Sequence, residues 1–234
     1  MDTPFLLDTS IRLFAALPLT LTILAVSAVL ATALGALLTA ASVARSPALR
    51  GLQRGWTFLF RGTPLILQIF MIYYGLAMLP AIRHGMLWPA FREPLFCMCL
   101  ALTCCCSAYI GEVFRGALRA VSAGEIEAAR AAGMTPFQIV HRVTAPALIR
   151  IALPSYANEV VMMAKSTSLA STITLLDMTD VAQSVIAHSY RTMEVFLCAA
   201  AFYLALNAAL AGAFRLLADR LRAPRSTADL PEPL

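Results

Sequence analysis

Long uncharged, apolar runs alternate along the chain with short segments that are rich in arginine. A helix of about 18 to 20 apolar residues crosses the ~30 Å hydrocarbon layer of a membrane. Four uncharged runs approach or exceed that length, and they cover residues 13–44, 62–82, 94–111 and 195–214. A fifth run, residues 151–176, is interrupted mainly by Glu159 and Lys165. The pattern predicts an all-α, polytopic membrane protein with about five transmembrane helices, in a single domain over residues 1–234.

Composition agrees with a membrane protein, because 60% of the residues are hydrophobic and only 13% are charged, whereas soluble domains average about 25% charged residues. The six cysteines all fall within the apolar runs and are expected to fill space there. The three histidines are not at metal-ligand spacing, so no metal site is expected. The proline-containing tail, residues 223–234, is predicted to be disordered.

The basic residues are divided unevenly between the two sides of the predicted membrane. The segments after the first, third and fifth runs hold 13 of the 18 basic residues, namely Arg45, Arg50, Arg54, Arg61, Arg115, Arg119, Arg130, Arg142, Arg150, Arg215, Arg220, Arg222 and Arg225. The opposite side holds Arg12, Arg83, Arg92 and Arg191. The positive-inside rule therefore places the N-terminus outside and the C-terminus in the cytoplasm. The net charge of +5 is then a topology signal, and no nucleic-acid partner is expected.

Residues 122–148 form a polar segment in the middle of this apolar chain. Ser122 and Thr135 are each followed three residues later by Glu or Gln, which is the spacing of a helix N-cap. Gly133 between them predicts a left-handed residue that ends a first helix over residues 125–132. Because so short a helix is marginal unless it packs on something, we expect a helical hairpin that docks on a partner. A solvated loop between two spans is the alternative.

One motif in this hairpin resembles the EAA loop of ABC importer permeases, whose pattern is E-A-A, three residues, G, nine residues and I-x-L-P. The chain has Glu127-Ala128-Ala129 followed by Gly133, while V-T-A-P stands in place of I-x-L-P. In that family the loop forms a coupling helix that sits in a cleft of the ATP-hydrolysing subunit. The resemblance implies an ATPase-coupling role for Glu127, Ala128, Ala129, Gly133 and Pro136.

Two further segments resemble the polar amino-acid permeases of the histidine, lysine, arginine and glutamine type. They are FRGTPLILQ at residues 60–68, and LPSYANE at residues 153–159 followed by KSTSL at residues 165–169. The likeness extends over roughly residues 18–217. It implies that both segments, including Thr63 and Gln68 of the first, line a substrate pathway. Many relatives carry an acidic residue where this chain has Ser166.

Glu159 lies well inside the fifth run, where an ionised side chain costs about 2.5 to 3.5 kcal/mol. Helical spacing places Asn158, Met162 and Lys165 on one stripe and Glu159, Met163 and Ser166 on the adjacent one, and together they form a polar flank. Glu159 could pair with Lys165 or with a neighbouring helix in a purely structural role. Alternatively, as the resemblance implies, this flank lines the translocation pathway and contacts an amino acid. Glu112, by contrast, is expected to pair with Arg115 near the cytoplasmic interface.

The chain has no phosphate-binding loop, because its one lysine, Lys165, follows M-M-A and not glycines. It is therefore expected to bind no cofactor and to be non-catalytic, with ATP and Mg²⁺ held by a separate pair of ATP-binding subunits. Five helices are too few to enclose a hydrophilic path, so a second permease subunit, homologous or identical, is expected.

The resemblance also implies an extracytoplasmic amino-acid-binding protein and a location in the lipid of a bacterial inner membrane. The predicted function is import of polar, cationic amino acids by alternating access. The alternative is an ion-coupled secondary transporter or small channel subunit, which would leave the hairpin unexplained.

Overall fold

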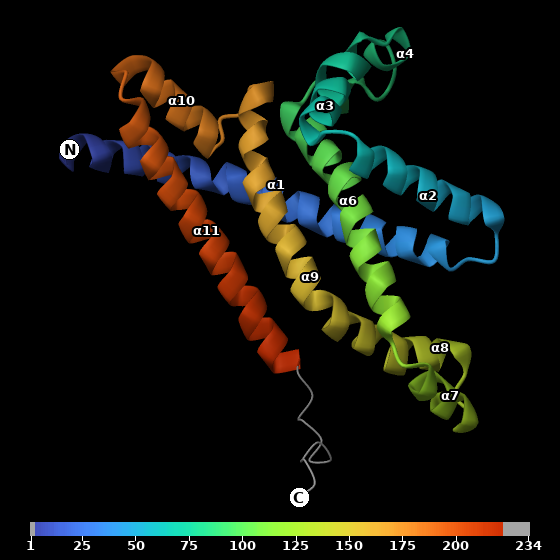
Figure 1. Cartoon of the computed structure of the whole chain (residues 1–234). Coiled ribbons are helices and arrows are strands. Elements are labelled where there is room, and N and C mark those ends of the chain that lie inside the picture. The colour runs from blue at the N-terminus through green and yellow to red at the C-terminus, as the bar shows by residue number, and fades with distance from the viewer. Residues whose placement is uncertain (1–2, 222–234) are drawn as a thin grey trace, which may run out of the picture.

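The computed structural model describes residues 3–221, and within that range the chain is almost entirely helical (Figure 1). Its α-helices are α1 (Thr3–Ser42), α2 (Pro47–Gly62), α3 (Leu65–Phe70), α4 (Pro80–Arg83), α5 (Trp88–Phe91), α6 (Pro94–Ala120), α7 (Ala123–Ala131), α8 (Pro136–Ile139), α9 (Ala145–Ser166), α10 (Met178–Ser189) and α11 (Thr192–Leu221). Two π-helices, η1 (Met71–Gly75) and η3 (Val140–Thr144), and two 3₁₀-helices, η2 (Leu76–Met78) and η4 (Thr167–Ile173), connect some of them. The predicted disordered tail, residues 223–234, lies outside the described residues.

The all-α fold is confirmed, but fewer helices than expected are long and apolar enough to cross a membrane. Within residues 3–221 there are three, α1, α6 and α11, or up to four if the bent pair formed by α2 and the residues after it is one span. Helix α9 has 22 residues and packs between α6 and α11 (Figure 1). It is not among the three because Arg150, Asn158 and Glu159 lower its mean hydropathy.

The expected second span, residues 62–82, begins at a break between two helices and is not one straight helix. Helices α2 and Leu65–Met78 meet at an angle of 105°, because Pro64 has no N–H to donate and drives Thr63 into an extended conformation. The buried Gln68 side chain compensates for the break. Its Nε2 donates to the carbonyl oxygens of Phe60 (3.0 Å) and Thr63 (3.1 Å) and to Thr63 Oγ1 (2.9 Å). A bend inside a membrane requires partners of this kind for its freed backbone groups.

Helix α1 makes its largest contact with α6, and glycine allows the two backbones to approach closely. A Cβ atom added at Gly35 would lie 2.9 Å from Ile110 Cγ2 and 3.1 Å from the backbone nitrogen of Gly111. Thr39 Oγ1 donates across the same crossing to the Gly111 carbonyl oxygen at 3.1 Å. The main apolar core, which includes Ile23, Leu102 and Met163, forms around this crossing and α9.

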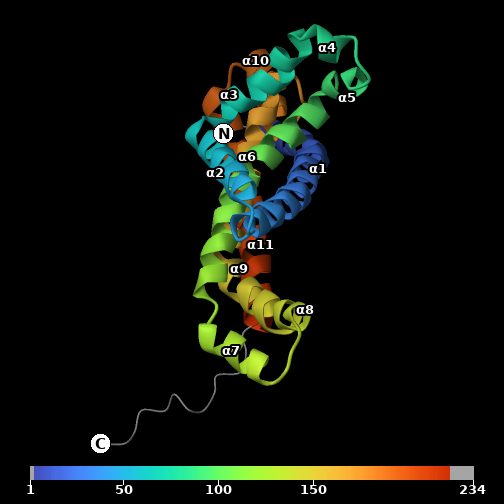
Figure 2. The same ribbon diagram turned by 90° about the vertical axis from the view of Figure 1, so that its right-hand side faces the viewer.

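The segment between α9 and α11 is largely helical. Thr174, in a left-handed conformation, ends η4, and the buried Asp177 caps α10 through a bond from the Asp180 amide at 3.0 Å. Tyr203 of α11 donates its hydroxyl to Asp177 at 3.2 Å. Figure 2 shows α4 and α5 at one end of the molecule and α7 and α8 at the other.

Candidate functional site

A cavity of about 650 Å³ lies beside the bend between α2 and α3. Five of the seven residues predicted for the substrate pathway line it, namely Thr63, Asn158, Glu159, Met162 and Ser166. The rest of the wall comes from the bend and from two other helices, and consists of Arg61, Gly62, Pro64, Leu65, Cys105, Cys106, Tyr109 and Met163. Three segments that are far apart in the sequence therefore meet at this site, which we call the membrane cavity.

The two other predicted pathway residues lie elsewhere. Gln68 does not line the cavity; it is buried at the bend, which its side chain supports as described above. Lys165 does not line the cavity, although its neighbour Ser166 does. Among the described residues, no ion pair joins Lys165 to Glu159. The pairing considered from the sequence is thus not formed.

The charged neighbour of Glu159 is Arg61. Both residues line the membrane cavity, and the Arg61 guanidinium lies over the ring of Tyr109, 5.0 Å from the ring centroid. Within residues 3–221, no hydrogen bond or ion pair occupies the carboxylate oxygens of Glu159. The membrane cavity therefore presents one carboxylate, one guanidinium and the Asn158 amide to a small molecule that carries both signs of charge.

From the sequence, Arg61 was expected only among the basic residues of the cytoplasmic side. The signal that could have found it was present, because Arg61 stands directly before Gly62 and Thr63 in the motif that was assigned to the pathway. The bend turns the end of α2 towards α9, and this brings Arg61 to the level of Glu159.

The polar hairpin has the predicted turn. Gly133 is left-handed, with φ of +76°, and its amide donates to the Arg130 carbonyl oxygen at 2.9 Å. The Met134 amide donates to the Ala129 carbonyl oxygen at 3.1 Å, which completes a Schellman motif at the end of α7. Glycine is favoured there because it adopts this conformation without the cost of about 1 to 2 kcal/mol that a Cβ atom adds.

The two predicted caps of the hairpin differ in the structure. Thr135 and Gln138 form a capping box, with Thr135 N to Gln138 Oε1 at 2.8 Å and Gln138 N to Thr135 Oγ1 at 3.4 Å. Ser122 is at the N-cap position of α7, but its side chain makes no capping hydrogen bond. The second helix is also not separate, because α8 continues through η3 into α9 without a break.

The hairpin encloses a groove of about 490 Å³ between α7 and the start of α9. Ala128 and Ala129 both line it, and Ala129 is 6% exposed. Glu127, Ala128 and Pro136 are exposed. The outer surface of the hairpin therefore remains available to a partner, while Ala129 holds the hairpin together.

No cluster of three or more His, Cys, Asp or Glu residues that could hold a metal ion occurs in the described part of the chain. All six cysteines are free thiols, and Cys97, Cys99 and Cys105 are buried in the packing of α6.

Residues 31–223 match the family described as "Binding-protein-dependent transport system inner membrane component". The chain is 45% identical over 216 residues to an octopine transport system permease protein of Rhizobium radiobacter, covering 92% of this chain and 88% of that protein. It is 38% identical to a histidine/lysine/arginine/ornithine transport system permease protein of Salmonella typhimurium, with 86% of each chain covered. A solved structure of an amino acid ABC transporter with histidines superimposes with a TM-score of 0.78 and 26% identity, over 94% of this chain and 99% of that one.

Proposed function

The chain belongs to the family of binding-protein-dependent transport system inner membrane components, and we propose that it imports polar, cationic amino acids as the permease subunit of an ATP-binding-cassette importer. Its relatives include permease proteins of an octopine transport system and of a histidine/lysine/arginine/ornithine transport system. These names support a cationic amino acid as the substrate. This family depends on a binding protein, whereas an ion-coupled transporter or a small channel subunit would not.

The observation that carries the proposal is the pair of opposite charges in the membrane cavity. Glu159 accepts hydrogen bonds from the ammonium or guanidinium group of the substrate, and Arg61 faces its carboxylate. Asn158, Thr63 and Ser166 supply polar contacts along the same wall. Met162 supplies a flexible apolar surface that accommodates side chains of different length. Gln68 and Lys165 act outside the cavity, Gln68 by holding the bend.

ATP and Mg²⁺ are bound by a separate pair of ATP-binding subunits, and this chain itself binds no cofactor. The exposed surface around Glu127, Ala128 and Pro136 docks on that pair, while Ala129 and Gly133 fix the shape of the hairpin. A second permease subunit, homologous or identical, completes the pathway. An extracytoplasmic amino-acid-binding protein delivers the substrate. ATP-driven closure of the ATPase pair moves the hairpin and switches access between the two sides.

The proposed orientation in the membrane places the N-terminus outside and the C-terminus in the cytoplasm. The exposed leucines of α1 and α11 then contact membrane lipid. The orientation can be tested with cysteines placed at Ser122, beside α7, and at Met86, which is 95% exposed between α4 and α5. Impermeant thiol reagents should label the first only from the cytoplasm and the second only from outside. Labelling in the reverse sense would contradict both the orientation and the coupling role of the hairpin.

The role of Glu159 is tested by Glu159→Gln in the complete transporter reconstituted in vesicles. Uptake of arginine, lysine or histidine should fall by about 10- to 100-fold, because a charge-assisted hydrogen bond worth about 1.5 to 3 kcal/mol is lost. Uptake of a neutral amino acid should change much less. Glu93→Gln, an exposed carboxylate outside the cavity, is the matched control.

Recovery of the intact complex separates the two roles that Glu159 could have. An intact complex with unchanged cation uptake would defeat the substrate contact. Poor recovery of the complex would instead return Glu159 to a structural role.

A further inference from the structure

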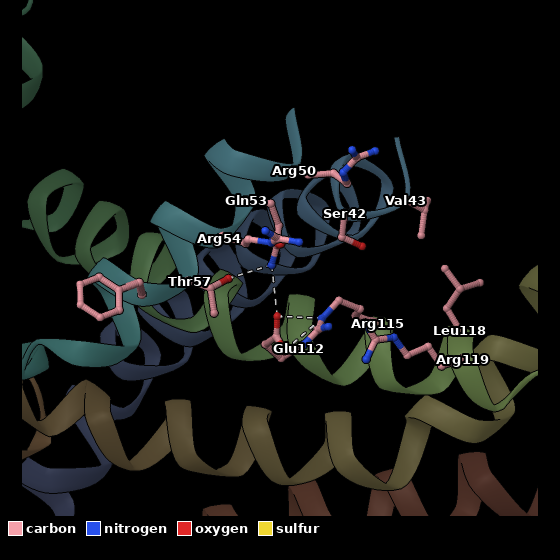
Figure 3. A pocket seen from close by; sticks show the side chains of 11 residues that line it. Ser42, Val43, Arg50, Gln53, Arg54, Thr57, Glu112, Arg115, Leu118 and Arg119 are labelled. Carbon is pink, nitrogen blue, oxygen red and sulfur yellow. Dashed lines mark hydrogen bonds and ion pairs between the residues drawn. The ribbon is translucent and has the colours of Figure 1, made fainter. Parts of the chain in front are cut away.

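A second polar cavity, of about 470 Å³, lies between the end of α1, helix α2 and the half of α6 that leads to the hairpin (Figure 3). Four arginines line it, namely Arg50, Arg54, Arg115 and Arg119. Glu112 is its only acidic lining residue. We call it the basic cavity. Its formal charge is therefore +3, and no part of the transport mechanism described above uses it.

Part of this charge is neutralised inside the protein. Glu112 accepts from Arg115 Nε (3.0 and 3.1 Å) and from Gln53 Nε2 (3.1 Å), which confirms the Glu112–Arg115 pair expected from the sequence. Arg50 Nη1 donates to the carbonyl oxygens of Ala44 (2.8 Å) and Arg45 (3.1 Å). Figure 3 shows Gln53, Glu112 and Arg115 joined in one chain of contacts.

The other two arginines have no such partner. Arg54 and Arg119 are exposed, and no hydrogen bond or ion pair within residues 3–221 engages either guanidinium. They come from different elements, α2 and α6, and line the same cavity. Two guanidinium groups with unused donors are suited to a phosphate, whose oxygens accept paired N–H bonds.

The rim of the basic cavity is apolar, although it is open to the surroundings. Phe58 is 84% exposed and Val43 is 63% exposed, and both are lining residues. The exposed Leu52 and Leu59 continue this apolar surface along α2. A soluble phosphate would leave such a rim in contact with water, whereas a phospholipid would cover it with acyl chains.

We propose that the basic cavity binds the phosphate headgroup of an anionic phospholipid from the cytoplasmic leaflet. Basic pockets between membrane helices on the cytoplasmic side recognise lipid headgroups in this way. The lipid would tie α2 to α6, two of the elements that form the membrane cavity. The choice of leaflet rests on the proposed orientation. Binding of the lipid itself is measured without reference to transport, so it can fail or succeed independently of the proposed function.

The test is native mass spectrometry of the complete transporter, exchanged into detergent with equal amounts of phosphatidylglycerol and phosphatidylcholine of the same acyl length. The wild type should retain phosphatidylglycerol preferentially. The double variant Arg54→Gln/Arg119→Gln should lose about tenfold or more of that preference, since each basic residue near an anionic lipid contributes about 1 kcal/mol. Arg45→Gln/Arg220→Gln removes the same charge from exposed positions outside the cavity and should behave as the wild type.

Two further arms use the wild type alone and do not depend on how a variant folds. Short-chain phosphatidylglycerol should displace the retained lipid, whereas inorganic phosphate at millimolar concentration should not. Equal retention of both lipids by the wild type would overturn the proposal, and so would equal loss of preference in the two double variants. Displacement by inorganic phosphate would assign the site to a soluble anion and would also overturn it.

Discussion

The polar hairpin and the membrane cavity are ordered by different kinds of contact. In the hairpin, the bonds that set the turn and the cap join residues no more than five positions apart, such as Met134 to Ala129. In the membrane cavity, Arg61, Tyr109 and Glu159 come from three separate helices. The hairpin can therefore be damaged by a change in its own few residues. The membrane cavity depends on helix crossings that lie outside its walls.

The largest effect should come from Gly35→Val, at the crossing of α1 with α6. The new side chain would meet Ile110 and the backbone of Gly111, next to Tyr109 of the cavity wall. Overpacking of this kind costs about 3 kcal/mol. We expect a clear fall in the thermal midpoint of the detergent-solubilised transporter. Gly116→Val, on α6 with open space around its Cα, is the control and should change the midpoint little. Similar midpoints for the two variants would contradict the close approach.

The next effect should come from Gln68→Leu, which keeps the size of the side chain but removes the bonds that hold the bend. Loss of the contacts to Phe60 and Thr63 should cost about 2 kcal/mol. Uptake should fall as Arg61 moves relative to Glu159, whereas association with the ATPase should persist, because the hairpin is untouched. Gln183→Leu makes the same change at an exposed site on α10. Normal uptake by the Gln68 variant would show that the bend needs no such support.

A smaller effect on stability is expected from Gly133→Val, because the left-handed conformation costs a residue with a Cβ about 1 to 2 kcal/mol. Transport and coupled ATPase activity should fall while membrane insertion persists. Gly124→Val is the matched change inside α7, where the new Cβ meets only Ser122 Oγ at 3.6 Å. Wild-type transport by the Gly133 variant would remove the argument that the turn must be fixed.

The smallest effects distinguish the two caps. Thr135→Ala removes one half of the capping box and should cost about 1 kcal/mol. Ser122→Ala should cost close to nothing, because the Ser122 side chain makes no capping bond. Thermal melting of the two variants side by side measures the difference. An equal loss at both sites would mean that Ser122 caps α7 after all.

These differences also explain what the sequence could predict. Gly133 and the Thr135–Gln138 box were found because local spacing alone defines them. Helix α6 begins at Pro94, as the uncharged run predicted. The bend at Pro64 was missed because residues 62–82 carry no charge, and hydropathy does not detect a change of direction.

The membrane cavity could be predicted only in part. Asn158, Glu159, Met162 and Ser166 lie on one helix, so their spacing placed them together. Arg61 reaches the same cavity through the bend, and Tyr109 through the packing of α6, and neither position follows from local pattern. Lys165 is close to Glu159 in sequence, yet it points elsewhere because a helix carries the two side chains to different faces.

The uninterrupted helix from α8 through η3 into α9 gives the molecule a lever arm. Pro136, on the outside of the hairpin, and Glu159, in the membrane cavity, are parts of the same curved rod (Figure 1). At 1.5 Å per residue they are separated by roughly 35 Å of helix. A tilt of about 5° at the hairpin would therefore displace Glu159 by roughly 2 to 3 Å, about the length of one hydrogen bond. If Glu159 binds substrate as proposed above, a push too small to reshape the hairpin would then be enough to break that contact.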